Sequence, residues 1–201
     1  LCPPPALLAT NTSAISITEI ASGAASRGRI LGTHFWNPPW LVPLVEVVPG
    51  RDTAPWAMES ACALLLEAGK RPVRVEEGVP GFVGNRLAHG LWGGAVSIVG
   101  GGIADAETVD EVVKTGFRMR LLVLGPLENA DMVGLDLTLK IHAYLLEHLE
   151  DSREPSPLLR EKVEKGELGF ASGRGFRSWT PREMEECRAN LLRHLVEWGT
   201  K

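Results

Sequence analysis

The chain has 201 residues, a formal net charge of −4 and 44% hydrophobic residues. This length is enough for one domain or two small ones with a sizeable core. This charge, with no basic run, argues against a nucleic-acid binder, and no apolar stretch is long enough to cross a bilayer. Cys2, Cys62 and Cys187 form no CxxC pair, so their spacing predicts neither a disulfide framework nor a metal site. We therefore expect a cytoplasmic protein with no membrane or nucleic-acid partner.

Up to residue 78 the sequence alternates between short strands and helices. Apolar runs predict strands over residues 5–10, 29–35, 44–48 and 72–75. A capping box from Ser16 to Glu19 predicts a short helix after the first strand. A longer helix is predicted over residues 53–68, with Gly69 at its C-terminal cap. The alternation is typical of part of an α/β sheet.

After Gly78 the apolar residues recur with helical spacing and no convincing strand follows. We predict helices over residues 82–99, 105–115, 128–149, 156–164 and 180–198. The last begins at a second capping box, Thr180 to Glu183, with proline at its first helical position. We place a domain boundary here, with an α/β part over residues 1–78 and an all-α part over residues 79–201.

Four glycines interrupt the first helix of the second part. Each costs about 1 kcal/mol relative to alanine in a helix interior. Either the backbones of neighbouring helices approach closely there, or the helix depends on tertiary packing. The glycines are Gly84, Gly90, Gly93 and Gly94.

The two residues with the clearest chemical potential are Glu46 and His34. Glu46 lies in a strand that is apolar on both faces, so the carboxylate is either buried with a partner or exposed on an edge strand, and we rate the two about equally. His34 lies near the end of the preceding strand, where ligands bind in open α/β sheets, although a structural histidine is the commoner case. If the strands are neighbours, the pair forms a general base, because the carboxylate orients the imidazole and stabilises its protonated form.

Other polar residues give weaker signals. Ser13 follows the first strand in a polar turn, and Asn85 lies near a helix start; both are ordinary positions for these residue types. Four further histidines lie in predicted helices without a matching ligand set, and we interpret them as structural or surface residues. No GxGxxG or GxxxxGK[ST] sequence occurs, so nothing predicts the usual cradle for a pyrophosphate.

Taken together, six segments in order resemble the 3-hydroxyacyl-CoA dehydrogenase family. They are Asn11-Thr12-Ser13, Gly32-Thr33-His34-Phe35-Trp36-Asn37-Pro38, Leu44-Val45-Glu46-Val47-Val48, Val79-Pro80-Gly81-Phe82-Val83-Gly84-Asn85-Arg86, Leu124-Gly125-Pro126-Leu127-Glu128 with Gly134-Leu135-Asp136, and Pro155-Ser156-Pro157-Leu158-Leu159 with Gly173-Arg174-Gly175-Phe176. The resemblance covers residues 6 to about 178. It implies a remnant of a Rossmann NAD-binding domain followed by an all-α C-terminal dimerisation domain.

The resemblance also implies a reaction and a role for each matching residue. The reaction is the NAD-dependent oxidation of an L-3-hydroxyacyl-CoA to a 3-ketoacyl-CoA. His34 would be the catalytic base and Glu46 would orient it. Ser13 and Asn85 would hold the substrate near its C3 oxygen. Ser13 would also lie close to the nicotinamide, and Asn37 would contact the cofactor.

Three hypotheses stay open at this point. The first is a dehydrogenase acting on a 3-hydroxyacyl-CoA and forming a homodimer through its helices. The second keeps the chemistry but changes the substrate to a hydroxy acid or alcohol without CoA, since the Trp36-Asn37-Pro38-Pro39 variant also resembles relatives with other substrates. The third is a non-catalytic dimerisation module. We expect the chain to begin inside the NAD-binding domain, with its phosphate-binding part upstream.

Overall fold

The computed structural model describes residues 2–76 and 78–199. Its strands form one four-stranded sheet in the order β1-β2-β3-β4. The strand β1 runs parallel to β2, β2 antiparallel to β3, and β3 parallel to β4. Each predicted strand is present within a few residues of its expected place. The bounds are Leu8–Thr10 for β1, Ile30–Phe35 for β2, Leu44–Pro49 for β3 and Arg71–Arg74 for β4.

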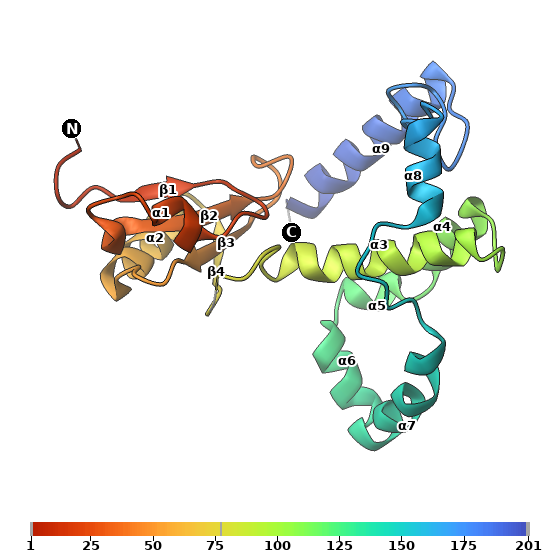
Figure 1. Ribbon diagram of the computed structural model, residues 1–201, viewed down its shortest axis with the longest axis horizontal. Helices are drawn as coiled ribbons and strands as arrows, with labels where there is room; N and C mark the ends of the chain where they lie inside the picture. Colours follow the sequence, from red (N-terminus) through yellow and green to blue (C-terminus); the bar gives the residue numbers. More distant parts are fainter. Residues whose placement is uncertain (1, 77, 200–201) are drawn as a thin grey trace. The chain divides into compact units, whose positions relative to one another are not determined.

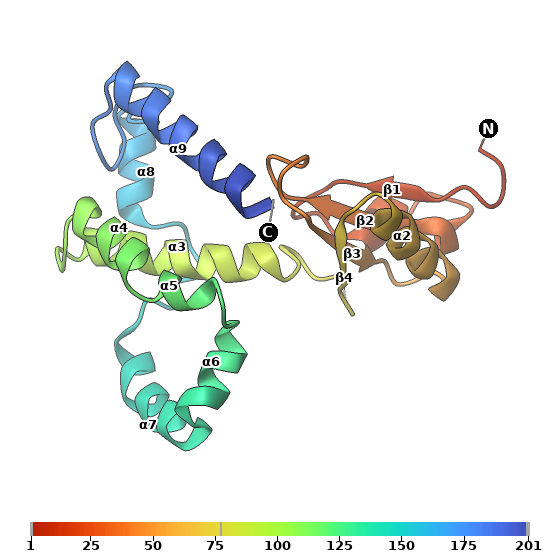
Figure 2. The ribbon, with the colours of Figure 1, turned by 180° about the vertical axis from the view of Figure 1, so that it is seen from behind.

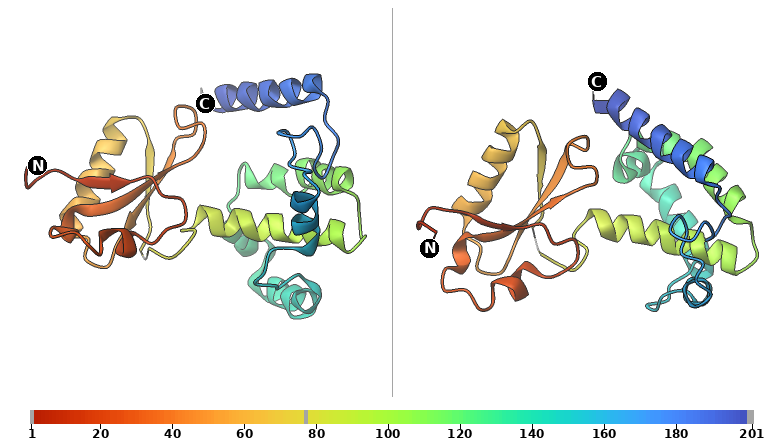
Figure 3. Two further views of the ribbon diagram at one scale, coloured as in Figure 1. Left: turned by 45° about the horizontal axis from the view of Figure 1, so that its top comes forward. Right: turned by 90° about the horizontal axis from the view of Figure 1, so that it is seen from above.

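Two helices cover opposite faces of this sheet, which Figure 3 shows from two directions. The helix α2 (Pro55–Glu67) packs on the face that carries Leu31, Val45 and Val47. The short helix α1 (Ile17–Ala21) packs on the other face, next to Val48. Alternation along a strand explains the division, because neighbouring side chains point to opposite faces. In Figure 2, which shows the chain from behind, α2 lies over the strands.

The two predicted capping boxes have different outcomes. At Thr180 the box forms in both directions: the Glu183 carboxylate accepts the Thr180 N–H at 2.8 Å, and the Thr180 hydroxyl accepts the Glu183 N–H at 3.2 Å. At Ser16 the helix begins as predicted, but no side-chain cap forms, so that part of the prediction is wrong. Burial of Ile17 holds α1 on the sheet instead.

The second part of the chain is rich in helices, which Figure 1 shows as α3 to α9. Among the described residues after Gly78, the only strand-like pairings are isolated bridges from Gly169 to Arg174 and from Arg174 to Ser178. The bounds are Gly84–Gly100 for α3, Ala106–Thr115 for α4, Arg118–Leu121 for α5, Pro126–Val133 for α6, Leu135–Leu145 for α7, Pro157–Glu164 for α8 and Pro181–Gly199 for α9; single 3-10 turns cover Arg27–Arg29 (η1) and Leu146–His148 (η2).

The single helix predicted over residues 128–149 is wrong, because Gly134 divides it. Gly134 adopts φ +107°, a backbone conformation that ends α6 and allows α7 to start in a new direction. The apolar spacing continues across this break, so periodicity alone did not reveal it. The start was also misplaced: Glu128 lies in the first turn of α6, where its carboxylate accepts the Gly125 N–H at 2.6 Å.

The glycines of α3 divide into two kinds. At Gly84 a Cβ atom would lie 2.3 Å from the Trp36 ring, so the close approach requires glycine. At Gly90, Gly93 and Gly94 a Cβ atom would meet nothing within 4 Å in the described part of the chain. Close approach therefore explains only Gly84, and the neighbour there is the Trp36 side chain and not the backbone of another helix.

By its internal contacts the chain forms two compact units. One runs to His89 and takes in residues from Cys187 on, and the other is Gly90–Glu186. The boundary predicted near Gly78 stays a prediction. No helix in residues 2–76 or 78–199 is long and apolar enough to cross a membrane.

Candidate active site

His34 and Glu46 lie directly opposite each other on the antiparallel strands β2 and β3. The ring atom Nδ1 of His34 is 2.8 Å from Oε2 of Glu46. Both residues are buried, with exposed fractions of 5% and 2%. The sequence predicted this pairing on the condition that the strands are neighbours, and the structure meets that condition.

The second carboxylate oxygen of Glu46 is held by the start of α3. The backbone N–H groups of Val83 and Gly84 both donate to Oε1, each at 3.0 Å. Burial acts to raise the pKa of Glu46, but the hydrogen bonds from Gly84, His34 and Val83 outweigh it and lower that pKa below its usual value. The geometry therefore favours a charged carboxylate beneath His34.

Phe82 turns the backbone so that these two N–H groups face Glu46. Its φ is +48°, in the left-handed region that residues with a side chain seldom adopt, and its side chain is 1% exposed. Gly81 before it is also left-handed, with φ +79°. Strained backbone of this kind clusters at functional sites. Sequence reasoning singled out Gly84 and Asn85 in this segment but missed what its backbone does.

Two aromatic rings flank the imidazole. The ring centroids of Trp36 and Phe82 each lie 5.6 Å from that of His34. Trp36 reaches this place because Gly84 leaves room for its indole. With Nδ1 bonded to Glu46 and rings packed beside the imidazole, Nε2 is the ring nitrogen left for a reacting molecule.

The structure brings Ser13 and Asn85 together as well. The Asn85 side-chain nitrogen donates to the Ser13 backbone carbonyl at 2.9 Å. The loop that carries Ser13 is fixed to β2 by Asn11, whose side-chain oxygen accepts the Phe35 N–H at 3.0 Å. Sequence reasoning used Asn11 only as part of a motif; its position directly after a strand was the signal for this role.

Asn37 is exposed and directly follows β2. Because β1 and β2 are parallel, the loops that carry Ser13 and Asn37 both follow the carboxyl end of a strand, at the same end of the sheet. Among the described residues, no hydrogen bond or ion pair joins Asn37 to His34 or Glu46. Its predicted role rests on the motif.

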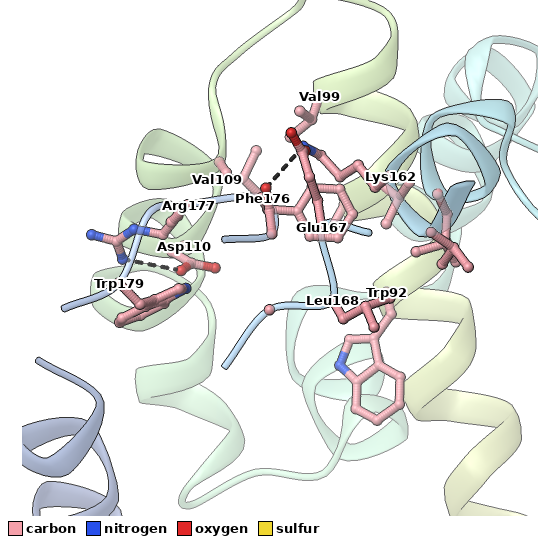
Figure 4. A pocket seen from close by; sticks show the side chains of 17 residues that line it. Trp92, Val99, Val109, Asp110, Lys162, Glu167, Leu168, Phe176, Arg177 and Trp179 are labelled. Carbon is pink, nitrogen blue, oxygen red and sulfur yellow. Dashed lines mark hydrogen bonds and ion pairs between the residues drawn. The ribbon is translucent and has the colours of Figure 1, made fainter. Parts of the chain in front are cut away.

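A cavity of about 580 Å³ lies elsewhere, inside the unit Gly90–Glu186 (Figure 4). Residues of α3, α4 and α8 line it together with the segment 167–179. Lys162 donates to Glu167 at 2.9 Å and to the Gly175 carbonyl at 2.8 Å, and Arg177 pairs with Asp110 at 3.6 Å. None of the predicted site residues lines this cavity. Within residues 2–76 and 78–199 no cluster of His, Cys, Asp and Glu could hold a metal ion.

Comparison with protein families finds two adjacent matches. The NAD-binding domain of 3-hydroxyacyl-CoA dehydrogenase matches residues 1–78, and the C-terminal domain of the same family matches residues 81–179. A probable 3-hydroxybutyryl-CoA dehydrogenase of Bacillus subtilis is 42% identical over 177 residues, which cover 88% of this chain and 60% of the relative.

Two solved structures show the same likeness. The structure of 5-formyl-3-hydroxy-2-methylpyridine 4-carboxylic acid 5-dehydrogenase, described as an NAD+-dependent dismutase, superposes with a TM-score of 0.91 at 34% identity, covering 95% of this chain and 62% of that one. The (S)-3-hydroxybutyryl-CoA dehydrogenase of Ralstonia eutropha gives 0.68 at 36% identity, covering 87% and 60%. The chain spans about 60% of the length of three of the curated relatives it matches, and less than half of two others.

Proposed function

Because the chain belongs to the 3-hydroxyacyl-CoA dehydrogenase family, we propose that it carries the acid–base residues of an NAD-dependent enzyme that oxidises L-3-hydroxyacyl-CoA to 3-ketoacyl-CoA. The observation that supports this most is the buried His34–Glu46 pair, with Nδ1 and Oε2 2.8 Å apart. A histidine oriented by a buried carboxylate is suited to accept a proton from an alcohol. The relatives named as 3-hydroxybutyryl-CoA dehydrogenases support the substrate class.

In this proposal His34 accepts the substrate proton and Glu46 stabilises the resulting positive charge. Nε2 of His34 takes the proton of the C3 hydroxyl while the C3–H bond breaks, so the C–O single bond becomes a carbonyl. Glu46 stabilises the imidazolium that forms, since its charge lies one hydrogen bond away. Bound NAD would supply the acceptor for the hydride that leaves C3.

Ser13 and Asn85 place the reacting oxygen in this proposal. Asn85 uses one amide N–H to hold the Ser13 carbonyl, and its second N–H is available to a substrate. The hydroxyl of Ser13 projects from an exposed turn. NAD fits this end of the sheet. Ser13 and Asn37 follow adjacent parallel strands, at the carboxyl ends where α/β sheets bind nucleotides.

The test is the formation of NADH by the whole protein with L-3-hydroxybutyryl-CoA, measured at 340 nm. We expect turnover with the L isomer and little with the D isomer. Absence of turnover with 3-hydroxyacyl-CoA thioesters of several chain lengths, in a protein that binds NAD, would contradict the proposed substrate class.

A second substrate class is favoured by one comparison. The TM-score of 0.91 was found with a dehydrogenase whose name gives a pyridine carboxylate as substrate, and it exceeds the 0.68 found with a 3-hydroxybutyryl-CoA dehydrogenase. The same NADH assay with free hydroxy acids and aromatic alcohols distinguishes the two. A kcat/KM for these that exceeds the value for the thioesters would favour the substrate without CoA.

We further propose that the helical part forms a homodimer, within the predicted division of residues 1–78 and 79–201. Large apolar side chains are highly exposed on its helices: Leu127 is 80% exposed, Leu139 69% and Tyr144 73%. Monomeric proteins seldom leave so many large apolar residues in water. A second copy of the chain is the partner that the family resemblance implies.

A further inference from the structure

The carboxylate of Glu46 has two kinds of hydrogen-bond partner: one can only donate, and the other can donate or accept. The N–H groups of Val83 and Gly84 can only donate, so Oε1 must be an acceptor. The ring atom Nδ1 of His34 can donate or accept, depending on the tautomer. The side that is chemically fixed is therefore the backbone turn, and the side that can change is the histidine.

We propose that the left-handed turn at Gly81–Phe82 is a positioning element that sets the tautomer of His34. It fixes two N–H groups on Oε1 of Glu46, which leaves Oε2 as the acceptor for His34. Because an ionised carboxylate can only accept, that arrangement requires a proton on Nδ1, so the neutral ring carries its lone pair on Nε2. The inference rests on the proposed function, in which Nε2 takes the substrate proton.

The turn has the properties that this role needs. Phe82 holds φ +48° although it is not glycine, and burial of its side chain to 1% exposure fixes that backbone. The two N–H groups it presents belong to the residues that begin α3, where the helix dipole also favours a negative charge. The resulting depression of the Glu46 pKa agrees with an acceptor held charged. His34 is the ionisable side chain bonded to this carboxylate.

Replacement Glu46→Gln tests the inference, because an amide has only one oxygen. If the turn controls the orientation, the amide oxygen stays on the Val83 and Gly84 N–H groups and the NH2 group faces His34. The ring must then accept at Nδ1 and carry its proton on Nε2. If the turn does not control it, the amide oxygen faces His34 and the tautomer stays as it was.

The tautomer is read from the ¹⁵N shifts of the His34 ring, in the whole protein at alkaline pH. The signals are assigned by their loss in His34→Gln. We expect protonated Nδ1 in the native protein and protonated Nε2 in Glu46→Gln, with kcat lower by about 10⁴-fold, the size found when a catalytic histidine is held in the wrong tautomer. Protonated Nδ1 in both proteins would overturn the inference.

A matched pair of variants tests the turn itself. Phe82→Leu and Phe82→Ile both remove the ring and have the same composition, but only isoleucine is branched at Cβ, which makes a positive φ a severe outlier. We expect the Glu46 carboxyl, followed by its ¹³C shift, to titrate near its native range with leucine and at a higher pH with isoleucine. Identical titration in the two variants would contradict the inference.

The ¹⁵N shifts of His34 and the ¹³C titration of Glu46 test the inference separately from the proposed function. The shifts report the turn and the tautomer whether or not the protein turns over a given substrate. Should Phe82→Ile not fold, the Glu46→Gln tautomer still decides. A tautomer that changes as expected without any loss of kcat would contradict the role of His34 while leaving the role of the turn intact.

Discussion

The region up to Phe82 and the helical region after it differ in what they bury. Every residue that is buried in the described part of the chain lies at or before Phe82, and the large apolar ones form two clusters around the sheet. No residue from Val83 to Gly199 is buried, and many large apolar side chains there are exposed to solvent. The first region supplies its own desolvated surroundings for a charged pair. The second leaves large apolar side chains exposed, which a second copy of the chain would cover in the proposed homodimer. We infer that chemistry belongs to the first and assembly to the second.

Replacement of His34 is the strongest test of this division. We expect His34→Ala to lower kcat by about 10²- to 10⁴-fold, the usual contribution of a general base, with a much smaller rise in KM. His142→Ala, in the exposed surface of α7, is the control and should leave kcat little changed. Steady-state kinetics on the whole protein measures both. An unchanged kcat in His34→Ala would exclude the residue as the base.

Replacement of a leucine by alanine should have unequal effects on stability in the two regions. Leu31 of β2 is fully buried in the cluster that includes residues of α2, and Leu31→Ala should lower the free energy of unfolding by about 2–5 kcal/mol. Leu127 is 80% exposed, and Leu127→Ala should change it by about 0.5 kcal/mol or less in dilute monomer. Urea denaturation at low protein concentration provides the comparison. Equal losses would mean that the helical region has a core of its own.

Assembly should depend on the helical region alone. Leu139→Glu places a charge in its exposed apolar surface, and we expect the dimer to weaken by about 30-fold, the equivalent of about 2 kcal/mol. Lys140→Gln, at the next position of α7 and 77% exposed, should leave the dimer intact. Sedimentation velocity over a concentration series measures the change. A monomeric native protein at all concentrations would contradict the proposed homodimer.

The sequence predicted the sheet region well because its signals are local. Glu46 in an apolar strand and a short connection from His34 were enough to suggest a buried pair. The helical region was harder, since apolar spacing continues through Gly134 and only the backbone angle there separates α6 from α7. Periodicity reports which face is apolar and says little about where one helix ends.

The part of the site that the sequence missed depends on backbone direction. The N–H groups of Val83 and Gly84 hold Glu46, yet no side-chain type at those positions signals it. Phe82 takes a conformation that residue statistics assign to glycine or asparagine. Such strain is imposed by tertiary packing, so it becomes visible only once the strands and α3 are placed.

The smallest expected effect concerns pH, and it again separates the two regions. The pKa of Glu46 is lowered in the folded protein, so its contribution to stability is full above the usual glutamate pKa of about 4.3 and is lost as the pH falls through the lower folded value. The pKa values of Asp105 and Glu183 are lowered too, first of all by the backbone N–H groups of Thr108 and Thr180, but both carboxylates lie at the surface.

Salt should therefore tell these contributions apart. At about 1 M salt the screening length is about 3 Å, which weakens surface charge interactions but leaves a buried hydrogen-bonded pair largely intact. We expect the acid loss of stability that disappears in Glu46→Gln to persist at high salt, while the part that disappears in Glu183→Gln shrinks. Urea midpoints between the usual glutamate pKa and more acidic pH, with and without salt, measure both. If salt reduces the two contributions equally, Glu46 is solvated like a surface group. The proposed contrast between a buried pair in the first region and surface charges in the second would then be wrong.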